Sequence, residues 1–400
     1  MNILVVHEVS YKDKVVYEYQ DFAERFALHG HSVTVIDFEE NGDGGGGAER
    51  CSRTGLAEVE LVHVPYRDIP VIRYLSARKN YRNLLTEKLN KGAVDVVLLY
   101  SVFVNGTITV ELCREFGVPV VYRVLDIYHR IGRNLLAMLP LWLGEKYIYR
   151  NADIICVTNS MIAGYVQKMA GTGKVKELRV LTHGVDMEFF KPAPRDPDLS
   201  ERYDLEDDDK VALFLGTTYA FSGLVKVVER FGILEKICPH AKILIVGSGE
   251  IDSDLKKKVD DLGLQKRVIL AGMQPYSNVP AHLSLADCFF NSFELNDITR
   301  NIIPIKILQY VACGKPVLST PIPDVVNHFP EIESGIIYSD ISDPDTFVEK
   351  LGHLLNDSEQ SHVLGANAIS HCMKNCSMEN QFGQLAEILT RRAIKRQVRL

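Results

Sequence analysis

Side chains that could hold a negatively charged ligand are concentrated in one segment of the C-terminal half. Arg300 and Asn301 come just before Pro304, and Lys306 and Gln309 follow it. A proline fits the first turn of a helix, so the segment after it is expected to be helical, with its beginning at the carboxyl edge of a sheet. The amide groups at such an end attract anions, and a lysine there could direct positive charge toward a diphosphate. A solvated helix position explains Lys306 equally well.

Glycine-bearing loops follow three apolar runs in the same half of the chain. They are Gly216-Thr217, Gly247-Ser248 and Gly272-Met273. Because glycine has no side chain, such a loop can bring backbone N–H groups close to a phosphate, and the next helix adds the positive end of its dipole. Each loop alone is also explained as a tight turn between a strand and a helix. Together, the three loops favour a nucleotide or phosphate site.

Asp126 is the candidate for orienting or acid–base chemistry in the N-terminal half. It follows the apolar run 120–124, which predicts a position at the carboxyl edge of a sheet. There it could orient a hydroxyl group or act as a base. An aspartate that caps a helix explains the residue equally well.

Neither a metal site nor an organic cofactor is expected. The eight cysteines form no CxxC pair. Cys372 and Cys376 stand at i and i+4 beside His371, but no second ligand pair lies nearby in the sequence, so helix packing is favoured over a metal site. The first apolar run is followed by residues 7–10, HEVS, which lack the glycine fingerprint of dinucleotide-binding proteins.

Alternating strands and helices must position these residues. Apolar runs and helix-like stretches alternate in the first half, and the alternation restarts after a proline-rich and acidic stretch at 191–210. Repeated strand–helix–strand units form parallel sheets. We therefore predict an α/β chain of two Rossmann-like, doubly wound domains, at 1–192 and 205–377, with a C-terminal helix at 378–400 that packs back on the first. The expected strands are 3–6, 32–36, 94–100, 118–122 and 153–157, then 211–216, 242–247, 268–272, 288–292 and 316–319.

The composition is that of a globular protein with no nucleic-acid partner. Of the 400 residues, 46% are hydrophobic and 24% charged, and the net charge is −7. Nucleic-acid-binding proteins normally carry a positive excess instead. No apolar run approaches the roughly 18 residues of a membrane-spanning helix. Residues 1–7 are expected to form a strand rather than a signal peptide, so we expect a cytoplasmic protein, with the inner face of the cell membrane as a further option.

Four segments resemble the GT-B glycosyltransferases of the large retaining family numbered 4. They are LHGHSV at 28–33, THGVD at 182–186 with FKP at 190–192, GSG at 247–249 and ACGKPV at 312–317, in the family's order over nearly the whole chain. The resemblance implies two domains that face each other across a cleft. A nucleotide-sugar donor would bind the second domain and a glycan, lipid or other hydroxyl acceptor the first. Transfer would retain configuration and require no metal, because positive charges and helix N-termini stabilise the leaving diphosphate.

The same resemblance implies a set of site residues. The expected catalytic residues are Asp126, Glu294 and Lys306. The expected donor-binding residues are Gly216, Thr217, Gly247, Ser248, Met273, Arg300, Asn301, Ile302, Ile303 and Gln309.

The chain departs from the family pattern at the motif that precedes ACGKPV. The family has two glutamates spaced E-x7-E, but Gln309 occupies the second position here. Asn301 occupies the first position if the segment aligns without a gap, and Glu294 occupies it if 295–300 is an insertion. A neutral glutamine can still accept hydrogen bonds from ribose hydroxyls, although more weakly than a carboxylate.

The chain departs from the family pattern at two further places: the loop after Gly216, which lacks positive charge, and position 125 in the expected acceptor domain. The family has an arginine and a lysine after the strand that ends at Gly216, where this chain has no positive charge until Lys226, and Leu125 stands where a histidine is usual. In one interpretation, Lys306 and Arg300 supply the charge instead. The alternatives are a GT-B-like binding or regulatory protein without transfer activity, and a sugar-nucleotide epimerase on the same fold.

A basic amphipathic stretch at 73–91 and an apolar stretch at 135–143 suggest a membrane contact. Basic amphipathic helices can lie on anionic membranes. A helix with one charged, solvated face and one core face is a slightly better explanation. The basic residues are Arg73, Arg78, Lys79, Arg82, Lys88 and Lys91.

Overall fold

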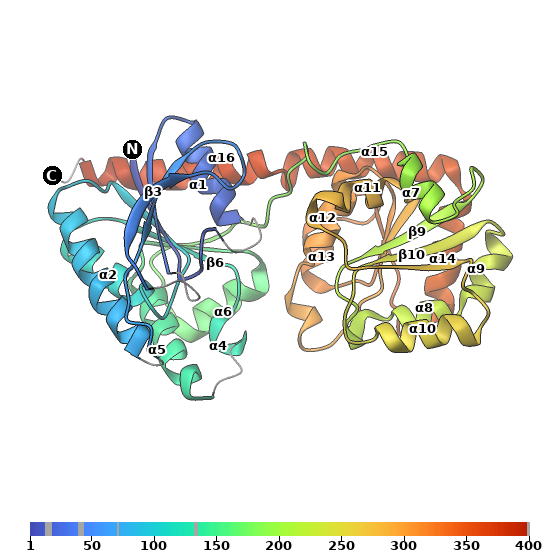
Figure 1. The fold of residues 1–400 in the computed structure, drawn as a ribbon, viewed down its shortest axis with the longest axis horizontal. Coiled ribbons are helices and arrows are strands. Elements are labelled where there is room, and N and C mark those ends of the chain that lie inside the picture. Colours follow the sequence, from blue (N-terminus) through green and yellow to red (C-terminus); the bar gives the residue numbers. More distant parts are fainter. Residues whose placement is uncertain (13–17, 39–43, 70–71, 132–134, 398–400) are drawn as a thin grey trace. The chain divides into compact units, whose positions relative to one another are not determined.

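The chain folds into two compact α/β units, each with its own sheet (Figure 1). Unit 1 comprises Met1–His183 and Gln381–Leu400, and unit 2 comprises Gly184–Asn380. The predicted fold class is confirmed in that each unit is built on a largely parallel sheet. This computed structural model describes residues 1–12, 18–38, 44–69, 72–131 and 135–397. Across those ranges, no helix has the length and apolar character needed to cross a membrane.

Unit 1 is built on an eight-stranded sheet in the order β3-β4-β2-β1-β5-β6-β7-β8. Its strands pair in parallel except for β3 and β4. The chain winds from β1 toward one edge and from β5 toward the other, so the winding direction switches between β1 and β5. The strands are β1 (Asn2–Val6), β2 (Ser32–Asp37), β3 (Gly47–Cys51), β4 (Val59–His63), β5 (Val96–Leu99), β6 (Val120–Val124), β7 (Ile154–Val157) and β8 (Leu178–Val180). The helices are α1 (Glu18–Leu28), α2 (Ile72–Asn90), α3 (Gly106–Glu115), α4 (Tyr128–Ile131), α5 (Leu135–Asn151) and α6 (Ser160–Ala170).

Unit 2 is built on a six-stranded parallel sheet in the order β11-β10-β9-β12-β13-β14. Here the winding direction switches between β9 and β12. The strands are β9 (Lys210–Leu215), β10 (Ala241–Val246), β11 (Val268–Gly272), β12 (Cys288–Asn291), β13 (Val317–Ser319) and β14 (Ile336–Tyr338). The α-helices are α7 (Pro197–Arg202), α8 (Leu224–Glu229), α9 (Phe231–Ile237), α10 (Asp252–Asp261), α11 (Val279–Ser284), α12 (Ile305–Ala312), α13 (Pro323–His328), α14 (Pro344–Asn356) and α15 (Ser358–Asn375).

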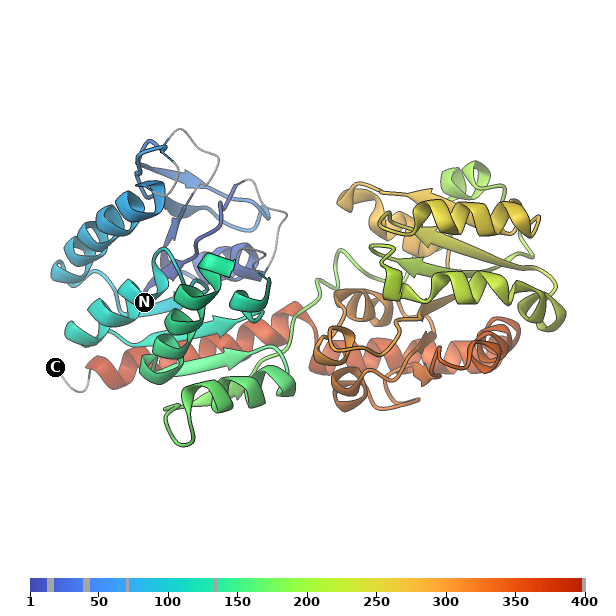
Figure 2. The same cartoon turned by 90° about the horizontal axis from the view of Figure 1, so that it is seen from below.

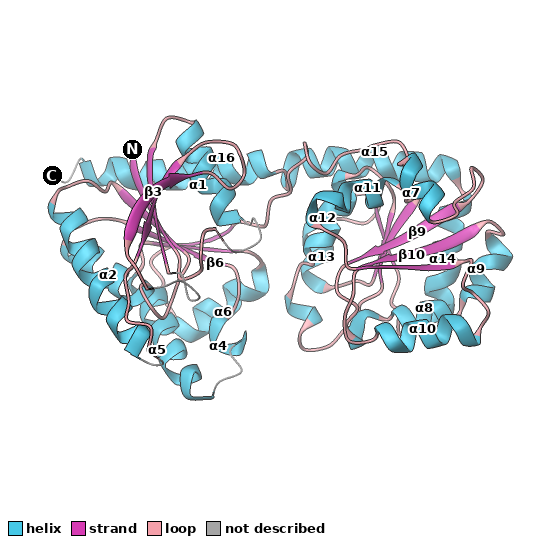
Figure 3. Ribbon diagram, viewed as in Figure 1, coloured by secondary structure: helices cyan, strands magenta, loops and turns pink. Residues whose placement is uncertain are grey.

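The central strands of both sheets form where the sequence is largely apolar. All residues of β5, β6, β7 and β10 are buried. In each unit, helices cover both faces of the sheet (Figure 3), and strands in such sheets are continuous apolar runs rather than alternating ones. The antiparallel edge strand β3 is different, since four of its five residues are exposed. No apolar run marks it, and the sequence did not predict it.

The chain leaves unit 1 at His183 and re-enters it at Gln381. Inside unit 2 the two connecting segments pair through backbone groups. The Val185 N–H donates to the Cys376 carbonyl and the Met378 N–H donates to the Val185 carbonyl, both at 2.9 Å. The division between the units therefore falls before the proline-rich stretch expected to link them.

The last helix, α16 (Met378–Gln397), packs on α1 of unit 1. The Phe382 ring lies 6.2 Å from that of Phe22 and 4.7 Å from that of Phe26, measured between centroids. Figure 2 shows this helix, in red, running along the elements of unit 1. Residues 398–400 of the predicted tail lie outside the described structure.

Candidate active site

The connections that follow β9 and β12 form the most suitable place for a ligand in unit 2. Ligands of open α/β sheets bind beyond the carboxyl ends of the strands, where the winding direction switches. β9 and β12 are neighbours, and the chain winds away from them in opposite directions. Residues 216–223 follow β9 and residues 292–304 follow β12, so these two connections flank the switch point.

Lys306 lies directly after the β12 connection and reaches the β9 connection. It lies in the first turn of α12, and its Nζ atom is 3.6 Å from the ring centroid of Phe214 and 4.1 Å from that of Phe293. A Cβ atom added to Gly216, directly after β9, would lie 3.5 Å from this Nζ. The lysine of the β12 side therefore places its amine against the β9 loop, which lacks a positive charge of its own.

The amine of Lys306 has no hydrogen-bond partner among the described residues, although the residue is only 8% exposed. Burial lowers the pKa of Lys306 well below its usual value, whereas the two aromatic faces favour the charged form. A buried amine without a partner costs free energy and is a frequent mark of a functional site. The alternative of a solvated helix position does not hold, because this side chain is buried.

Gly216 and Gly247 bring the backbones of two predicted donor loops into contact. Their φ angles are 121° and 139°, values that residues with a side chain rarely adopt. A Cβ atom on Gly247 would lie 2.1 Å from the carbonyl oxygen of Gly216. The loops after β9 and β10 therefore touch through bare backbone, as close approach to a phosphate would require.

Asp252 fixes the same loops through side-chain hydrogen bonds. Its carboxylate accepts from the Ser248 and Thr218 hydroxyls and from the Gly249 N–H. The Ser248 hydroxyl thus donates its proton inside the protein, so only the Ser248 backbone N–H could donate a hydrogen bond to a phosphate. Thr217, in the β9 loop, is half-buried.

Glu294 pairs with a lysine that the sequence did not connect to it. Its Oε1 atom lies 2.8 Å from Nζ of Lys226 in α8, and both side chains are about 40% exposed. The Glu294 N–H also donates to the carbonyl of Phe221. Glu294 therefore bridges the β12 and β9 connections, as Lys306 does, and Lys226 supplies a second positive charge near the switch point.

The other predicted donor residues lie around these two connections or after β11. Arg300 is exposed, while Ile302 and Ile303 are half-buried. Met273, directly after β11, is 72% exposed. Gln309 is buried in α12 and hydrogen-bonds Tyr276. The side chain of Asn301 lies outside the described part of the structure.

An aromatic row that the sequence did not indicate lines the β9 loop. The exposed Tyr219 ring stacks on Phe221, with centroids 4.8 Å apart and planes at 17°. Phe221 in turn meets the edge of Phe293 at 5.2 Å, and Phe293 is one of the two rings beneath Lys306. Aromatic residues in a loop follow no periodic spacing. Their stacking therefore could not be predicted from the sequence and is seen only in the structure.

Asp126 lies at the carboxyl edge of the unit 1 sheet, two residues before α4. Its side chain is exposed. Of the described residues, none hydrogen-bonds its carboxylate, so the structure gives it no capping bond. An exposed carboxylate at this edge remains available to a ligand of unit 1.

The predicted basic helix is largely neutralised by its own surroundings. Its apolar face, with Ala77, Tyr81, Leu85 and Leu89, is buried. The basic side chains with identified partners are Arg73 with Asp68, Arg78 with the Phe103 and Val104 carbonyls, Arg82 with Glu111, Lys88 with Glu60 and Lys91 with Glu87. Large apolar side chains are exposed near its beginning, at Ile69, Ile72 and Leu75. In the second predicted stretch, Leu139 and Leu143 are exposed, and the side chains of 135–137 lie outside the described structure.

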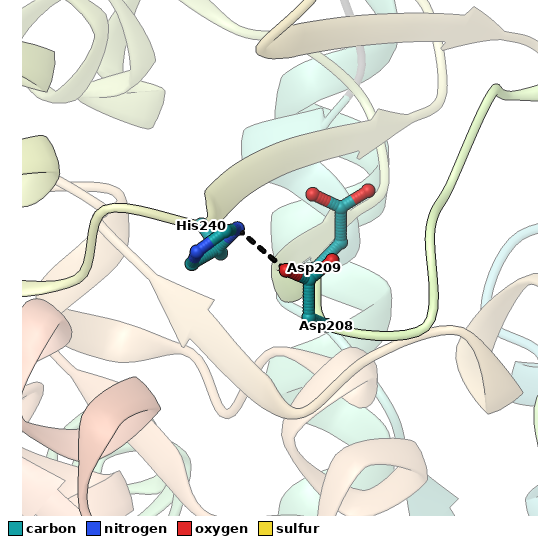
Figure 4. A group of neighbouring side chains, drawn as sticks. All are labelled: Asp208, Asp209 and His240. Carbon is teal, nitrogen blue, oxygen red and sulfur yellow. Dashed lines mark ion pairs between the residues drawn. The ribbon is translucent and has the colours of Figure 1, made fainter.

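Among the described residues, one group of possible metal ligands is found, and it lies at the amino ends of the unit 2 strands. Asp208 and Asp209 come just before β9, and His240 comes just before β10 (Figure 4). Asp208 pairs with His240 at 3.0 Å, and Asp209 pairs with Lys242 at 2.7 Å. Because His240 and Lys242 already form ion pairs with these carboxylates, we interpret the group as a structural feature rather than a metal site. Cys372 and Cys376 are buried in and directly after α15.

Two family models match the chain, one in each half. The model described as glycosyltransferase family 4 matches residues 19–189, and the model described as glycosyl transferases group 1 matches residues 196–371. Together the matches cover most of both units.

Several characterised proteins are similar in sequence or in fold. A GDP-mannose-dependent alpha-(1-6)-phosphatidylinositol monomannoside mannosyltransferase of Mycolicibacterium smegmatis is 25% identical over 67% of this chain and 70% of its own length. An alpha-monoglucosyldiacylglycerol synthase of Streptococcus pneumoniae is 22% identical over 70% of this chain and 64% of its own length. The solved structure of HepE from Anabaena in complex with UDP superposes with a TM-score of 0.70 at 14% identity, covering 98% of this chain and all of HepE.

The two relatives are named as a mannosyltransferase and as a glucosyldiacylglycerol synthase, and they do not favour the alternatives of a non-catalytic binding protein or an epimerase. The models, the relatives and the fold agree with the motifs at 28–33, 182–186, 247–249 and 312–317. The chain belongs to the GT-B glycosyltransferases of the family 4 type, which use nucleotide-sugar donors.

Proposed function

We propose that this protein transfers a sugar from a nucleoside diphosphate sugar to a hydroxyl group of a lipid or lipid-linked acceptor, with retention of configuration. Unit 2 binds the donor and unit 1 binds the acceptor. The position of Lys306 carries the proposal: a buried amine without a hydrogen-bond partner among the described residues lies against Gly216 at the switch point of the sheet.

The donor diphosphate lies between Lys306 and the backbone of the Gly216 and Gly247 loops. Its negative charge supplies the partner that the amine lacks, and the beginning of α12 adds its dipole. The nucleoside part of the donor lies near Tyr276, Met273 and Gln309. This arrangement explains why the β9 loop can lack the family's arginine and lysine.

In the transfer step, the bond between the sugar C1 and the diphosphate oxygen breaks and a bond between C1 and the acceptor oxygen forms. The acceptor approaches on the face that the diphosphate leaves, which retains the configuration, and its proton passes to the leaving diphosphate. Lys306 stabilises the charge that develops on the diphosphate, so no divalent cation is required. Asp126 orients the acceptor, and Glu294 holds Lys226 near the leaving group.

A lipid acceptor is supported by two observations. The relatives named above act on a phosphatidylinositol monomannoside or produce a glucosyldiacylglycerol, as their names state. In unit 1, Ile69, Ile72 and Leu75 expose large apolar side chains near the beginning of α2. We propose that this apolar edge, defined by these three residues, contacts the membrane surface and places the enzyme at the inner face of the cell membrane.

The test is turnover by the full chain with UDP-glucose and GDP-mannose. Phosphatidylcholine vesicles that contain diacylglycerol and phosphatidylinositol present the acceptor hydroxyls. We expect nucleoside diphosphate and glycolipid to form in equal amounts with one donor, with an α-linked product and with unchanged rate in EDTA. Loss of turnover in EDTA would contradict the metal-independent step, and an isomerised donor without glycolipid would indicate an epimerase.

A further inference from the structure

A histidine–carboxylate pair lies close to Asp126 in unit 1. His129 of α4 places its Nδ1 atom 2.6 Å from Oε2 of Glu145 in α5. The Glu145 side chain is fully buried, and that of His129 is 13% exposed. The sequence gives no sign of the pair, because the two residues belong to different helices and form no recognisable spacing.

Glu145 holds both the imidazole and the helix that carries it. The backbone N–H groups of Tyr128 and His129 also hydrogen-bond its carboxylate. Burial raises the pKa of Glu145, and these partners oppose the rise. The Tyr165 ring of α6 also stacks with the imidazole, with centroids 6.0 Å apart and planes at 28°. The ring is therefore fixed in one orientation.

The pairing also fixes the hydrogen-bonding character of the imidazole. In the neutral ring, a carboxylate at Nδ1 keeps the proton on that nitrogen and leaves a lone pair on Nε2. Glu145 and the Tyr165 hydroxyl, at 3.3 Å, both approach Nδ1. Across the described parts of the chain, Nε2 has no hydrogen-bond partner.

The pair lies where unit 1 is expected to bind a ligand. The Tyr128 hydroxyl donates to the carbonyl of Tyr100, directly after β5, at 2.9 Å. β5 borders the switch point of this sheet, and α4 follows Asp126 at the end of the adjacent strand, β6. The hydrogen bond therefore ties α4 to the crevice in which the rule for open sheets places a ligand.

Glu145 and two tyrosines near it bury polar atoms at a cost to the core. Oε1 of Glu145 and the hydroxyls of Tyr122 and Tyr149 are buried, and each lacks a hydrogen-bond partner within the described residues. The two tyrosine rings lie 6.0 Å apart, and the charge of Glu145 raises the pKa of both phenols, in addition to the larger effect of burial. Buried groups of this kind normally share an internal water. Apolar residues would pack here at lower cost, so the buried carboxylate of Glu145 is explained better by its contact with His129 than by core stability.

We propose that His129 is an acceptor-binding residue of the transfer reaction proposed above, on which this inference rests. Its Nε2 atom accepts a hydrogen bond from an acceptor hydroxyl that is not the reacting one, so the proton balance of the transfer is unchanged. Glu145 is the positioning residue that fixes the ring and its tautomer.

Steady-state kinetics of His129→Ala, His129→Gln and Glu145→Gln test the proposal, with His362→Ala, an exposed histidine of unit 2, as the matched control. The assay uses the same donors and vesicles as above. We expect His129→Ala to raise the acceptor KM at least tenfold while the donor KM changes less than twofold. His129→Gln, whose amide oxygen can accept the same hydrogen bond, should recover part of the loss. Glu145→Gln should raise the acceptor KM by a smaller factor, and the control should match wild type.

Two results would overturn the inference. One is an acceptor KM unchanged in both His129 variants, and the other is an equal loss of donor and acceptor affinity, which indicates a purely structural role. His129→Gln keeps the test valid if His129→Ala does not fold, since glutamine preserves most of the side-chain volume. A wild-type enzyme that turns over neither donor would instead contradict the proposed function.

Discussion

The amine of Lys306 lies against the β9 loop. In the family pattern this loop itself carries two basic residues, which are missing here. The amine comes from α12 and reaches the β9 loop across the aromatic rings of Phe214 and Phe293. The position is unfavourable for the free protein, because nothing in the described structure hydrogen-bonds the amine. Such a residue lowers the free energy of unfolding and is retained because it binds a ligand.

Replacement of Lys306 by methionine separates these two roles. We expect Lys306→Met to reduce turnover at least a hundredfold and to raise the free energy of unfolding by roughly 1–3 kcal/mol, since it removes a buried polar group without a partner. Calorimetry and donor turnover measure the two effects. Because burial lowers the pKa of Lys306 in the folded state, the unfolded chain binds more protons near neutral pH and stability rises with pH. The stability gain of the variant should therefore shrink as the pH rises toward 10.

Lys257→Met is the matched control for this change. Lys257 is an exposed residue of α10, and its replacement should leave both turnover and stability near wild type. A Lys306→Met enzyme with wild-type turnover would remove Lys306 from the donor site.

At the scale of elements, the contact between the β9 and β10 loops decides the shape of the donor site. Gly247→Ala should lower the free energy of unfolding by roughly 2–4 kcal/mol, because a methyl group there meets the Gly216 carbonyl in a backbone conformation that alanine rarely adopts. Chemical denaturation measures this loss. Gly232→Ala, in α9 with open space around it, should be stabilised or unchanged. Equal stability of the two variants would mean that the loops do not touch.

A buried ion pair joins α1 to β6 in unit 1. The Arg123 guanidinium donates to both carboxylate oxygens of Glu18 and to the Leu181 and Thr182 carbonyls. Burial alone would raise the pKa of Glu18, but Arg123, helped by His183, lowers it to about 2. The pair thus anchors the segment that leads out of unit 1.

Arg123→Leu should lower the free energy of unfolding by about 3–5 kcal/mol, because Glu18 would remain buried without its partner. The double variant Glu18→Leu with Arg123→Leu should recover most of that loss. In wild type, the lowered pKa of Glu18 stabilises the fold above about pH 4.5, and this contribution is lost as the pH falls toward 2. Urea unfolding between pH 3 and 7 measures both effects; an acid response unchanged in the double variant would exclude the pair as its source.

The sequence predicts most strands but not the partners of the site residues. Residues 243–246 of β10 form a continuous apolar run because helices cover both faces of the sheet, so the pattern is visible in the chain. β3 is polar and exposed at an edge, and nothing in its composition separates it from a loop. Glycines at the ends of β9 and β10 are equally predictable, since a tight turn requires them.

The direction of a side chain across the sheet is harder to predict. Lys306 can be placed at the start of a helix from Pro304, but its approach to Gly216 depends on β9 and β12 being neighbours. The same adjacency creates the Glu294–Lys226 pair. The His129–Glu145 pair requires two helices to pack side by side, which no local pattern reports.

At the scale of the whole molecule, the apolar edge of unit 1 predicts a membrane contact that depends little on charge. Most basic side chains of α2 already have protein partners, whereas Leu75 is 63% exposed. Leu75→Glu should weaken vesicle binding about tenfold or more, because it removes about 1.5–3 kcal/mol of apolar burial. Lys79→Gln, an exposed neighbour, should have a smaller effect. Co-sedimentation with phosphatidylcholine vesicles, with and without an anionic lipid, measures both, and equal binding of Leu75→Glu and wild type would exclude this edge.

The central claim is that unit 2 holds a nucleoside diphosphate sugar at Lys306, and ligand-dependent thermal unfolding of the full chain tests it most directly. The panel comprises UDP, GDP, ADP, CMP and their sugar conjugates, each with wild type and Lys306→Met. At a hundredfold excess over its dissociation constant, a ligand adds about 2.7 kcal/mol to the free energy of unfolding. We predict that nucleotides of one base raise the unfolding midpoint of wild type and that the rise is largely lost in Lys306→Met. No rise with any nucleotide, or an equal rise in both proteins, would contradict the claim.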